Sequence, residues 1–224
     1  MDANTILRNI LLPTDFSELA RNALTTGIAM CKRHNATLHL LHAVDNRYLI
    51  IPHEAHNTTI YLMPESEKSG MTGLEKLADT IKSKNNIKVE IHLDNGNPVD
   101  IIGKKAIDLH CELIVMGTHG DSGMRKFFMG STAYSVIKHT VIPVLTVPGN
   151  KKVKDFKRIL FPIRASKKII EKYGFIIPII ERNNAELIIA GLSLPDEPYS
   201  SELLNEEITE LGSLLKLNGT NFKS

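Results

Sequence analysis

Short apolar runs recur along the first 148 positions, separated by longer stretches in which apolar and polar residues alternate at helical spacing. The nearly continuous runs are Ile10-Leu11-Leu12, residues 36–44 (ATLHLLHAV) and residues 112–117 (ELIVMG). Runs of this length predict strands that are buried on both faces of a sheet. Residues 87–93 (IKVEIHL) and 141–147 (VIPVLTV) predict two further strands.

The stretches between these strands predict helices, and Ser17 is the predicted N-cap of the first one. The helices are expected at residues 17–32, 65–84, 98–110 and 131–139. Strands that alternate with helices indicate a parallel sheet covered on both faces, so the fold class is an α/β doubly wound domain. Pro143 favours an edge position for the last strand, because proline cannot donate to a central ladder.

The rest of the chain repeats the beginning of this pattern. Residues 158–166 (RILFPIRAS) match residues 9–17 (NILLPTDFS) at an offset of 149 positions, and the same offset relates 184–190 (NAELIIA) to 35–41 (NATLHLL). A constant offset across strand, helix and strand predicts an internal repeat. Only a helix, at about 200–217, is expected to follow, without further strands and without a second glycine loop.

The predicted organisation is therefore one complete and one truncated copy of the same fold. The first domain spans residues 1–149, a linker spans 150–157, and the incomplete copy spans 158–224. The linker is rich in lysine, which we interpret as a solvated segment rather than a nucleic-acid patch, because the chain as a whole is nearly neutral.

Composition narrows the class of protein. With 224 residues, 42% hydrophobic content and a formal net charge of +2, the chain is typical of globular proteins and gives no reason to expect nucleic acid or a membrane as partner. No signal peptide and no apolar run of membrane-spanning length is recognised, and the two cysteines form no disulfide framework. We therefore expect a cytoplasmic protein.

The segment GTHGDSGMRKFFMGS at 117–131 follows a predicted buried strand and carries the most informative pattern, G-x2-G-x9-G-S. A glycine-rich loop before a helix can direct several backbone N–H groups at one point, and the helix adds its positive N-terminal end, so such loops bind phosphate. The segment lacks the Gly-Lys-Ser/Thr of a P-loop and is not the dinucleotide fingerprint. The alternative is a loop whose glycines serve backbone geometry alone.

Metal and catalytic motifs are weak by comparison. The segment PHEAH at 52–56 lacks the spacing of a zincin motif, and its two histidines lie in a stretch that is not convincingly helical. His39 and His42 are three apart in a strand and face opposite sides, so they cannot chelate one ion together. No nucleophile-elbow motif is present. We therefore predict neither a metal site nor catalytic residues.

Three motifs in order resemble the universal stress protein family: Pro13-Thr14-Asp15-Phe16-Ser17, His42-Ala43-Val44-Asp45 and the glycine pattern closed by VIPVLTVP. The resemblance covers residues 5–148 and, incompletely, 157 to about 217. It implies a Rossmann-like sheet of order 3-2-1-4-5 that holds ATP, possibly with Mg²⁺, in the nucleotide-binding branch of the family. It further implies a role in the stress response, as a regulator or a partner-binding switch with an unidentified protein partner.

The resemblance also assigns a binding site at the switch point between the first and fourth strands. Residues near the adenosine part are Thr14, Asp15 and Ala43. Those for the ribose and phosphates are Gly117, His119, Gly120, Gly130, Ser131 and Thr132. Pro13 and Met116, at the ends of the same strands, complete the set. Alternatives are an adenine-nucleotide α-hydrolase-like enzyme with slow ATP hydrolysis and a scaffold that binds no nucleotide.

The truncated copy predicts association. Half a sheet cannot cover the apolar surface of its own strands and helix, and uncovered edges drive pairing with another chain. We expect a homodimer, formed either through the free edge at 141–147 or by two half-copies that complete one sheet between chains.

Overall fold

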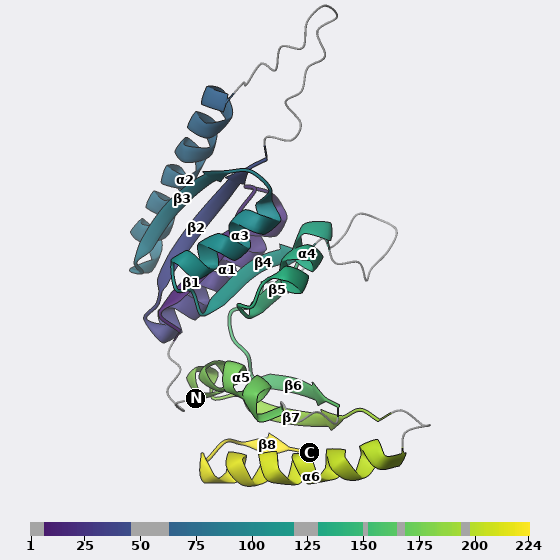
Figure 1. Ribbon diagram of the computed structural model, residues 1–224. Coiled ribbons are helices and arrows are strands. Elements are labelled where there is room, and N and C mark those ends of the chain that lie inside the picture. Colours follow the sequence, from purple (N-terminus) through teal and green to yellow (C-terminus); the bar gives the residue numbers. More distant parts are fainter. Residues whose placement is uncertain (1–6, 46–62, 119–129, 150–151, 165–168, 194–197) are drawn as a thin grey trace, which may run out of the picture. The chain divides into compact units, whose positions relative to one another are not determined.

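The computed structural model describes residues 7–45, 63–118, 130–149, 152–164, 169–193 and 198–224. Within them the chain divides into two compact units, Leu7–Lys154 and Asp155–Ser224. Each unit has its own sheet (Figure 1). No helix in the described part of the chain is both long enough and apolar enough to cross a membrane.

The first unit is a five-stranded parallel sheet in the order β3-β2-β1-β4-β5, as predicted. The strands are β1 (Asn9–Pro13), β2 (Thr37–Val44), β3 (Val89–Asn95), β4 (Leu113–Thr118) and β5 (Val144–Pro148). The helices are α1 (Glu18–His34), α2 (Met63–Asn85), α3 (Pro98–Asp108) and α4 (Ser131–His139). The α/β doubly wound fold class is therefore confirmed.

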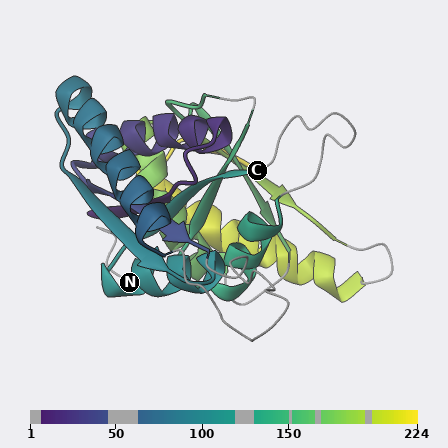
Figure 2. The ribbon, with the colours of Figure 1, turned by 90° about the horizontal axis from the view of Figure 1, so that it is seen from above.

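Residues of alternating parity cover the two faces of this sheet. Leu11 and Leu41 belong to a buried cluster with Ile102 of α3 and Val136 of α4. In β1 and β2 the even-numbered positions face the other helices: a Cβ added at Gly27 of α1 would meet the side chains of Leu12 and Leu38. Figures 1 and 2 show α1 and α2 on one face and α3 and α4 on the other.

Pro143 lies just outside the strand in which it was predicted. β5 begins at Val144, and the carbonyl oxygen of Pro143 accepts a hydrogen bond from the Ile114 N–H at 2.9 Å. A proline can supply this acceptor although it has no N–H to donate. The predicted edge position of β5 is confirmed by the strand order.

The second unit contains three strands rather than the two that the sequence predicted. Its elements are β6 (Arg158–Ile163), α5 (Ile169–Asn183), β7 (Glu186–Gly191), α6 (Pro198–Leu217) and β8 (Phe222–Lys223). The parallel sheet has the order β6-β7-β8. The two-residue β8 was missed because it is too short for a periodic signal; Phe222 packs against the buried cluster of this unit.

Strand pairing in the second unit follows that of the first at the offset found in the sequence. Asn9 pairs with Thr37 in the first unit, and Arg158 pairs with Glu186 in the second. Both first helices end next to an asparagine in the left-handed region, Asn35 at φ 53° and Asn184 at φ 47°. The same pattern of backbone conformation and register thus recurs 149 residues later.

The segment after β5 packs on the first unit. The buried Thr26 hydroxyl of α1 donates to the Val153 carbonyl oxygen at 2.7 Å, and the Asn22 side-chain amide donates to the carbonyl oxygen of Gly149. The first compact unit accordingly extends to Lys154. A chain cut at Gly149 would leave the Thr26 hydroxyl without this partner.

Candidate functional site

A cavity of about 360 Å³ opens at the carboxyl ends of β1 and β4. These two strands pair only at Ile10 with Leu113 and at Leu11 with Ile114, whereas β1 pairs with β2 along its whole length. β1 and β4 therefore separate towards their carboxyl ends. Strand order reverses at this point, where α/β sheets bind their ligands.

The cavity is lined by segments from six elements that converge on this edge of the sheet. Its polar lining consists of hydroxyls, one carboxylate and strand-end backbone, and its apolar lining comes from helices α1, α3 and α4 and from strands β1, β2 and β4. The lining residues are Pro13, Thr14, Asp15, Ser17, Leu19, Ala20, Leu41, Ala43, Pro98, Ile102, Met116, Gly117, Thr118, Thr132 and Ala133. The volume is in the range of small-molecule sites.

The turn from β1 to α1 is fixed by its own side chains. The Phe16 N–H donates to the Thr14 hydroxyl at 3.0 Å, and the Ser17 N–H donates to the Asp15 carboxylate at 3.0 Å. The Ser17 hydroxyl accepts from the Ala20 N–H at 3.2 Å, which confirms Ser17 as the N-cap of α1. Asp15 remains exposed, so its second oxygen can accept from a ligand.

Phe16 occupies a left-handed backbone conformation, φ 63°, which is uncommon for an aromatic residue. Its ring stacks on His42 with centroids 4.7 Å apart and packs on α2, where a Cβ at Gly73 would lie 2.9 Å from the ring. A Cβ at Gly70 would lie 2.8 Å from the His42 ring. Two glycines of α2 therefore make room for the pair that supports the β1–α1 turn.

The backbone of Ala43 points past the end of β1. The Thr37 N–H donates to the Arg8 carbonyl oxygen at 2.7 Å, and the Leu41 carbonyl oxygen accepts from the Thr14 N–H at 2.8 Å. Odd-numbered residues of β2 therefore direct their N–H and C=O groups towards β1. The β1–β2 pairing ends at Pro13 and Leu41. Because peptide groups alternate along a strand, the N–H and C=O of Ala43 face the cavity beyond that end.

In the second unit the equivalent backbone group is used by the sheet. Leu192 stands 149 residues after Ala43, and its N–H donates to the Ile163 carbonyl oxygen at 2.8 Å. The matching oxygen in the first unit belongs to Thr14, and it accepts from Nδ1 of His42 at 2.8 Å. His42 thus engages the acceptor that would otherwise suit the Ala43 N–H.

Helix α4 begins beside the cavity without a side-chain cap. Its N-cap is Gly130, which has no side chain to accept from the first-turn N–H groups, and Thr132 lines the cavity. From the sequence, the Ser131 hydroxyl could be either the N-cap or a phosphate donor; the first alternative is wrong, because Ser131 is the first helical residue and is exposed. An uncapped helix start offers its backbone donors and the positive end of its dipole to an anion.

Close packing against α1 requires glycine at position 117, a reason that the glycine pattern alone did not reveal. A Cβ at this position would lie 2.9 Å from the backbone oxygen of Leu19 in α1. Main-chain atoms cannot move aside as a flexible side chain can, so glycine lets α1 approach β4. Met116, on the opposite face, is buried in the core cluster and also lines the cavity.

Seven of the sequence-predicted residues line this one cavity: Pro13, Thr14, Asp15, Ala43, Met116, Gly117 and Thr132. Gly130 and Ser131 lie at the start of α4, next to Thr132 but outside the lining. His119 and Gly120 fall outside the described residues. Sequence reasoning missed the apolar wall from Leu19, Leu41 and Ile102, whose helix and strand periodicity marked them only as core.

Comparisons with known proteins identify the family and the fold. A model of the universal stress protein family matches residues 7–148. A Staphylococcus aureus (strain USA300) protein assigned to the universal stress proteins is 29% identical over 173 residues, which covers 74% of this chain and 96% of the relative.

Solved structures show the same fold. A universal stress protein from Archaeoglobus fulgidus superposes with a TM-score of 0.69 at 20% identity, covering 96% of this chain and 76% of its own. UspA from Lactobacillus plantarum gives a TM-score of 0.51 at 22% identity over 64% of this chain and 99% of its own. A universal stress protein in complex with cAMP gives 0.50 at 19% identity, covering 65% and 100%.

Proposed function

The chain belongs to the universal stress protein family, and from that premise we propose that its first unit binds an adenine nucleotide, ATP, in the cavity between β1 and β4. The observation that carries the proposal is the position of the Ala43 backbone at the mouth of that cavity. A complex with cAMP has been solved for a protein of this fold, which supports an adenine ring as the group to be recognised.

The chemistry of the cavity suits adenine and ribose. Adenine presents a donor, its exocyclic amine, beside an acceptor ring nitrogen, and the C=O and N–H of one extended residue complement that pair. Leu41, Ile102 and Met116 supply apolar surface for the flat base. The Asp15 carboxylate can accept from a ribose hydroxyl through Oδ2, since the bond from the Ser17 N–H uses Oδ1.

The phosphates would lie towards the start of α4. There the uncapped first turn and the Thr132 hydroxyl supply donors of the kind that phosphate oxygens accept. Ser131 and Gly130 belong to the same turn. His119 and Gly120 complete the proposed set, and a bound Mg²⁺ would offset phosphate charge there.

One nucleotide per chain is proposed. We interpret the second unit as an incomplete second copy, supported by its register and by its asparagine C-caps. Arg164 stands where the first unit has Asp15, and the Leu192 N–H is already bonded to Ile163. This unit therefore lacks the donor and the carboxylate that the first unit offers.

A regulatory role is the second part of the proposal. The cavity contains side chains that hold and orient a ligand, and we propose that nucleotide occupancy switches the affinity for a protein partner in the stress response. We further propose that the protein is a homodimer, because the sheets end in edge strands, β5 in the first unit and β6 in the second.

The experiment is calorimetric titration of ATP and AMP into nucleotide-free protein, with mass spectrometry of any nucleotide retained through purification. Ala43→Leu adds a side chain into the cavity, and leucine is the native residue at the matching position 192, so the strand should tolerate it. ATP affinity should fall by more than about tenfold, equivalent to about 1.4 kcal/mol. Leu192→Ala is the matched control and should leave affinity and stoichiometry unchanged.

Two results would contradict the proposal. Unchanged ATP affinity in the folded Ala43→Leu variant would exclude the cavity as the site. Two equivalent sites per chain would exclude the assignment of binding to the first unit alone.

A further inference from the structure

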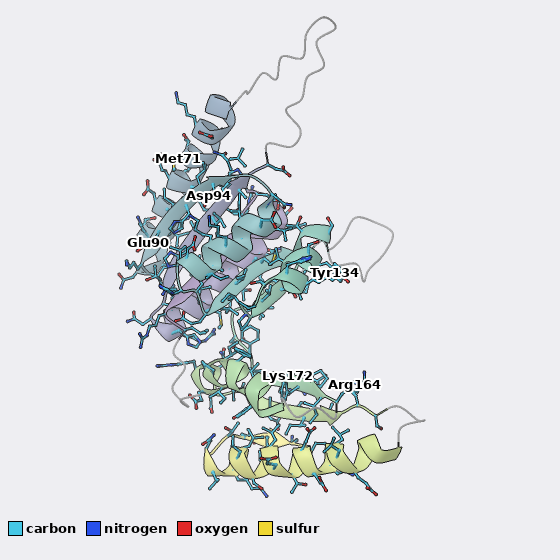
Figure 3. The ribbon with its side chains drawn as sticks, viewed as in Figure 1. Met71, Glu90, Asp94, Tyr134, Arg164 and Lys172 are labelled. Atoms are coloured by element: carbon cyan, nitrogen blue, oxygen red, sulfur yellow. The ribbon has the colours of Figure 1, made fainter. Side chains whose placement is uncertain are left out.

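Three side chains of the neighbouring strands β2 and β3 converge on one point. His39 of β2 pairs in register with Glu90 of β3, and His92 lies two residues further along β3, so all three are on the face covered by α3. One ligand atom from each falls within 4.8 Å of the other two. Glu90, labelled in Figure 3, marks the outer edge of the sheet at this place.

The spacing of the ligand atoms suits a tetrahedral ion. Nδ1 of His39 lies 3.0 Å from Nε2 of His92 and 3.5 Å from a carboxylate oxygen of Glu90. Bonds of about 2.0–2.2 Å at tetrahedral angles place ligand atoms roughly 3.4 Å apart. Two nitrogen donors and one oxygen donor form a set typical of Zn²⁺ sites that keep one position open.

A hydrogen bond to Asn9 orients His39 so that its Nδ1 atom can bind an ion. Nε2 of His39 lies 3.1 Å from the Asn9 side-chain oxygen, and the Asn9 amide nitrogen is directed at the His110 carbonyl oxygen at 3.5 Å. An amide oxygen only accepts, so the proton of His39 resides on Nε2 and the lone pair on Nδ1 faces the other two groups. Such an outer hydrogen bond is the usual partner of a metal-bound histidine.

Glu90 can contribute without losing its existing ion pair. Its Oε1 atom contacts the Lys88 ammonium at 2.8 Å, while Oε2 is the atom that faces His39. Lys105 of α3, the other cation near His92, is held by Asp94 at 2.8 Å. His92 is only half-buried, so its proton can move from Nε2 to Nδ1 through solvent when an ion binds.

We propose that His39, Glu90 and His92 form a binding site for a divalent transition-metal ion of the zinc class, separate from the nucleotide cavity. The ion would tie the edge strand β3 to β2. The site was not predicted because its histidines are 53 residues apart. The signal available in sequence was Glu90-x-His92, two potential ligands on one face of a strand.

The test is titration of ZnCl₂ into tag-free, chelator-treated full chain, followed by calorimetry, and titration of CoCl₂, followed by visible absorption. We expect one ion per chain and the visible absorption of low-coordinate Co²⁺. His92→Gln and Glu90→Gln, which alter partly exposed side chains, should each weaken Zn²⁺ binding by at least about tenfold. Asn9→Ala, which removes the outer hydrogen bond, should weaken it by about 10- to 100-fold.

Matched controls separate this site from the chain's other histidines. His139→Gln and the double change His53→Gln/His56→Gln should both leave the ion bound with unchanged affinity. ATP affinity should be unchanged in His92→Gln, because His92 does not line the nucleotide cavity. Absence of stoichiometric binding would overturn the proposal in favour of a plain His39–His92 hydrogen bond. Zn²⁺ affinity as high as that of the wild type in both Glu90→Gln and His92→Gln would also overturn it.

Discussion

Nδ1 of His42 donates a hydrogen bond to the carbonyl oxygen of Thr14 at 2.8 Å. In the second unit the counterpart of this Thr14 acceptor is the Ile163 carbonyl oxygen. That oxygen accepts a hydrogen bond from the backbone N–H of Leu192. A side chain thus replaces a ladder bond at the end of β1. The consequence is that the Ala43 N–H is directed at the cavity while the Thr14 oxygen is satisfied.

His42→Leu should weaken ATP binding by about fivefold, since one hydrogen bond contributes about 1 kcal/mol and the Thr14 carbonyl oxygen would compete for the Ala43 N–H. Calorimetry with the folded variant measures this. His139→Leu is the matched control, because Nδ1 of His139 also lies 2.8 Å from a backbone oxygen, that of Ser135, away from the cavity. Equal affinity in both variants would refute the role given to His42.

Gly117→Ala should destabilise the first unit by about 1–3 kcal/mol, the usual cost of inserting a carbon where the backbone is already in contact. Gly103→Ala is the matched control: nothing lies within 4 Å of an added Cβ in α3, so alanine should stabilise by about 0.5–1 kcal/mol. Urea unfolding measures both. An unchanged free energy of unfolding in Gly117→Ala would show that α1 can move away from β4 at little cost.

The thiols of Cys31 and Cys111 should resist alkylation in the native protein. Burial raises the pKa of each thiol to about 12, so the reactive thiolate is scarce at neutral pH. Iodoacetamide followed by mass spectrometry at about pH 8 should label both cysteines only after unfolding in urea. Labelling of the native protein at the unfolded rate would contradict the burial of the thiols.

These raised pKa values also fix the sign of a pH effect. The unfolded thiols ionise near 9 and the folded ones near 12, so their contribution to stability is complete below about pH 9 and is lost as the pH rises through that window. Between about pH 8 and pH 10.5, wild type should lose more unfolding free energy than Cys31→Ala/Cys111→Ala. An equal loss in both proteins would assign the alkaline effect to other groups.

The sequence predicted the parts of the fold and site that rest on local pattern. The segment from Pro13 to Ser17 carries a strand end and a turn, and Ala43 lies near the end of the next strand. Because the strands are parallel, the edge of the sheet where these segments meet followed from topology. Other features depend on distant contacts. The β8 strand exists because Phe222 packs on a core assembled elsewhere, and the His39–His92 contact joins strands that become neighbours only in the folded sheet.

Local pattern also misled at single positions. A glycine-serine pair before a helix favours serine as the cap, yet Gly130 is the N-cap and Ser131 is already helical. The glycine loop suggested ligand approach as the reason for Gly117, while the nearest atoms to an added Cβ belong to the α1 backbone. Tertiary packing decides which of several possible partners a residue contacts. The periodicity of the sequence does not carry that information.

The proposed homodimer can be assigned to one sheet edge by two single changes. Val141, 80% exposed just before β5, and Leu160, 62% exposed on β6, are large apolar side chains at the two edges. Because both are exposed, Val141→Asp and Leu160→Asp should alter folding stability by less than about 0.5 kcal/mol. A buried aspartate at a chain–chain contact, in contrast, would prevent association.

Light scattering after size-exclusion chromatography at micromolar concentration measures the outcome. Pairing through β5 predicts a monomer for Val141→Asp and a dimer for Leu160→Asp, and completion of the half-sheet between chains predicts the reverse. A chain ending at Lys154 keeps the Thr26–Val153 hydrogen bond, so it should fold under either alternative. It should remain dimeric only if the chains pair through β5. A monomeric wild type would exclude both, because neither edge would then bind a second copy.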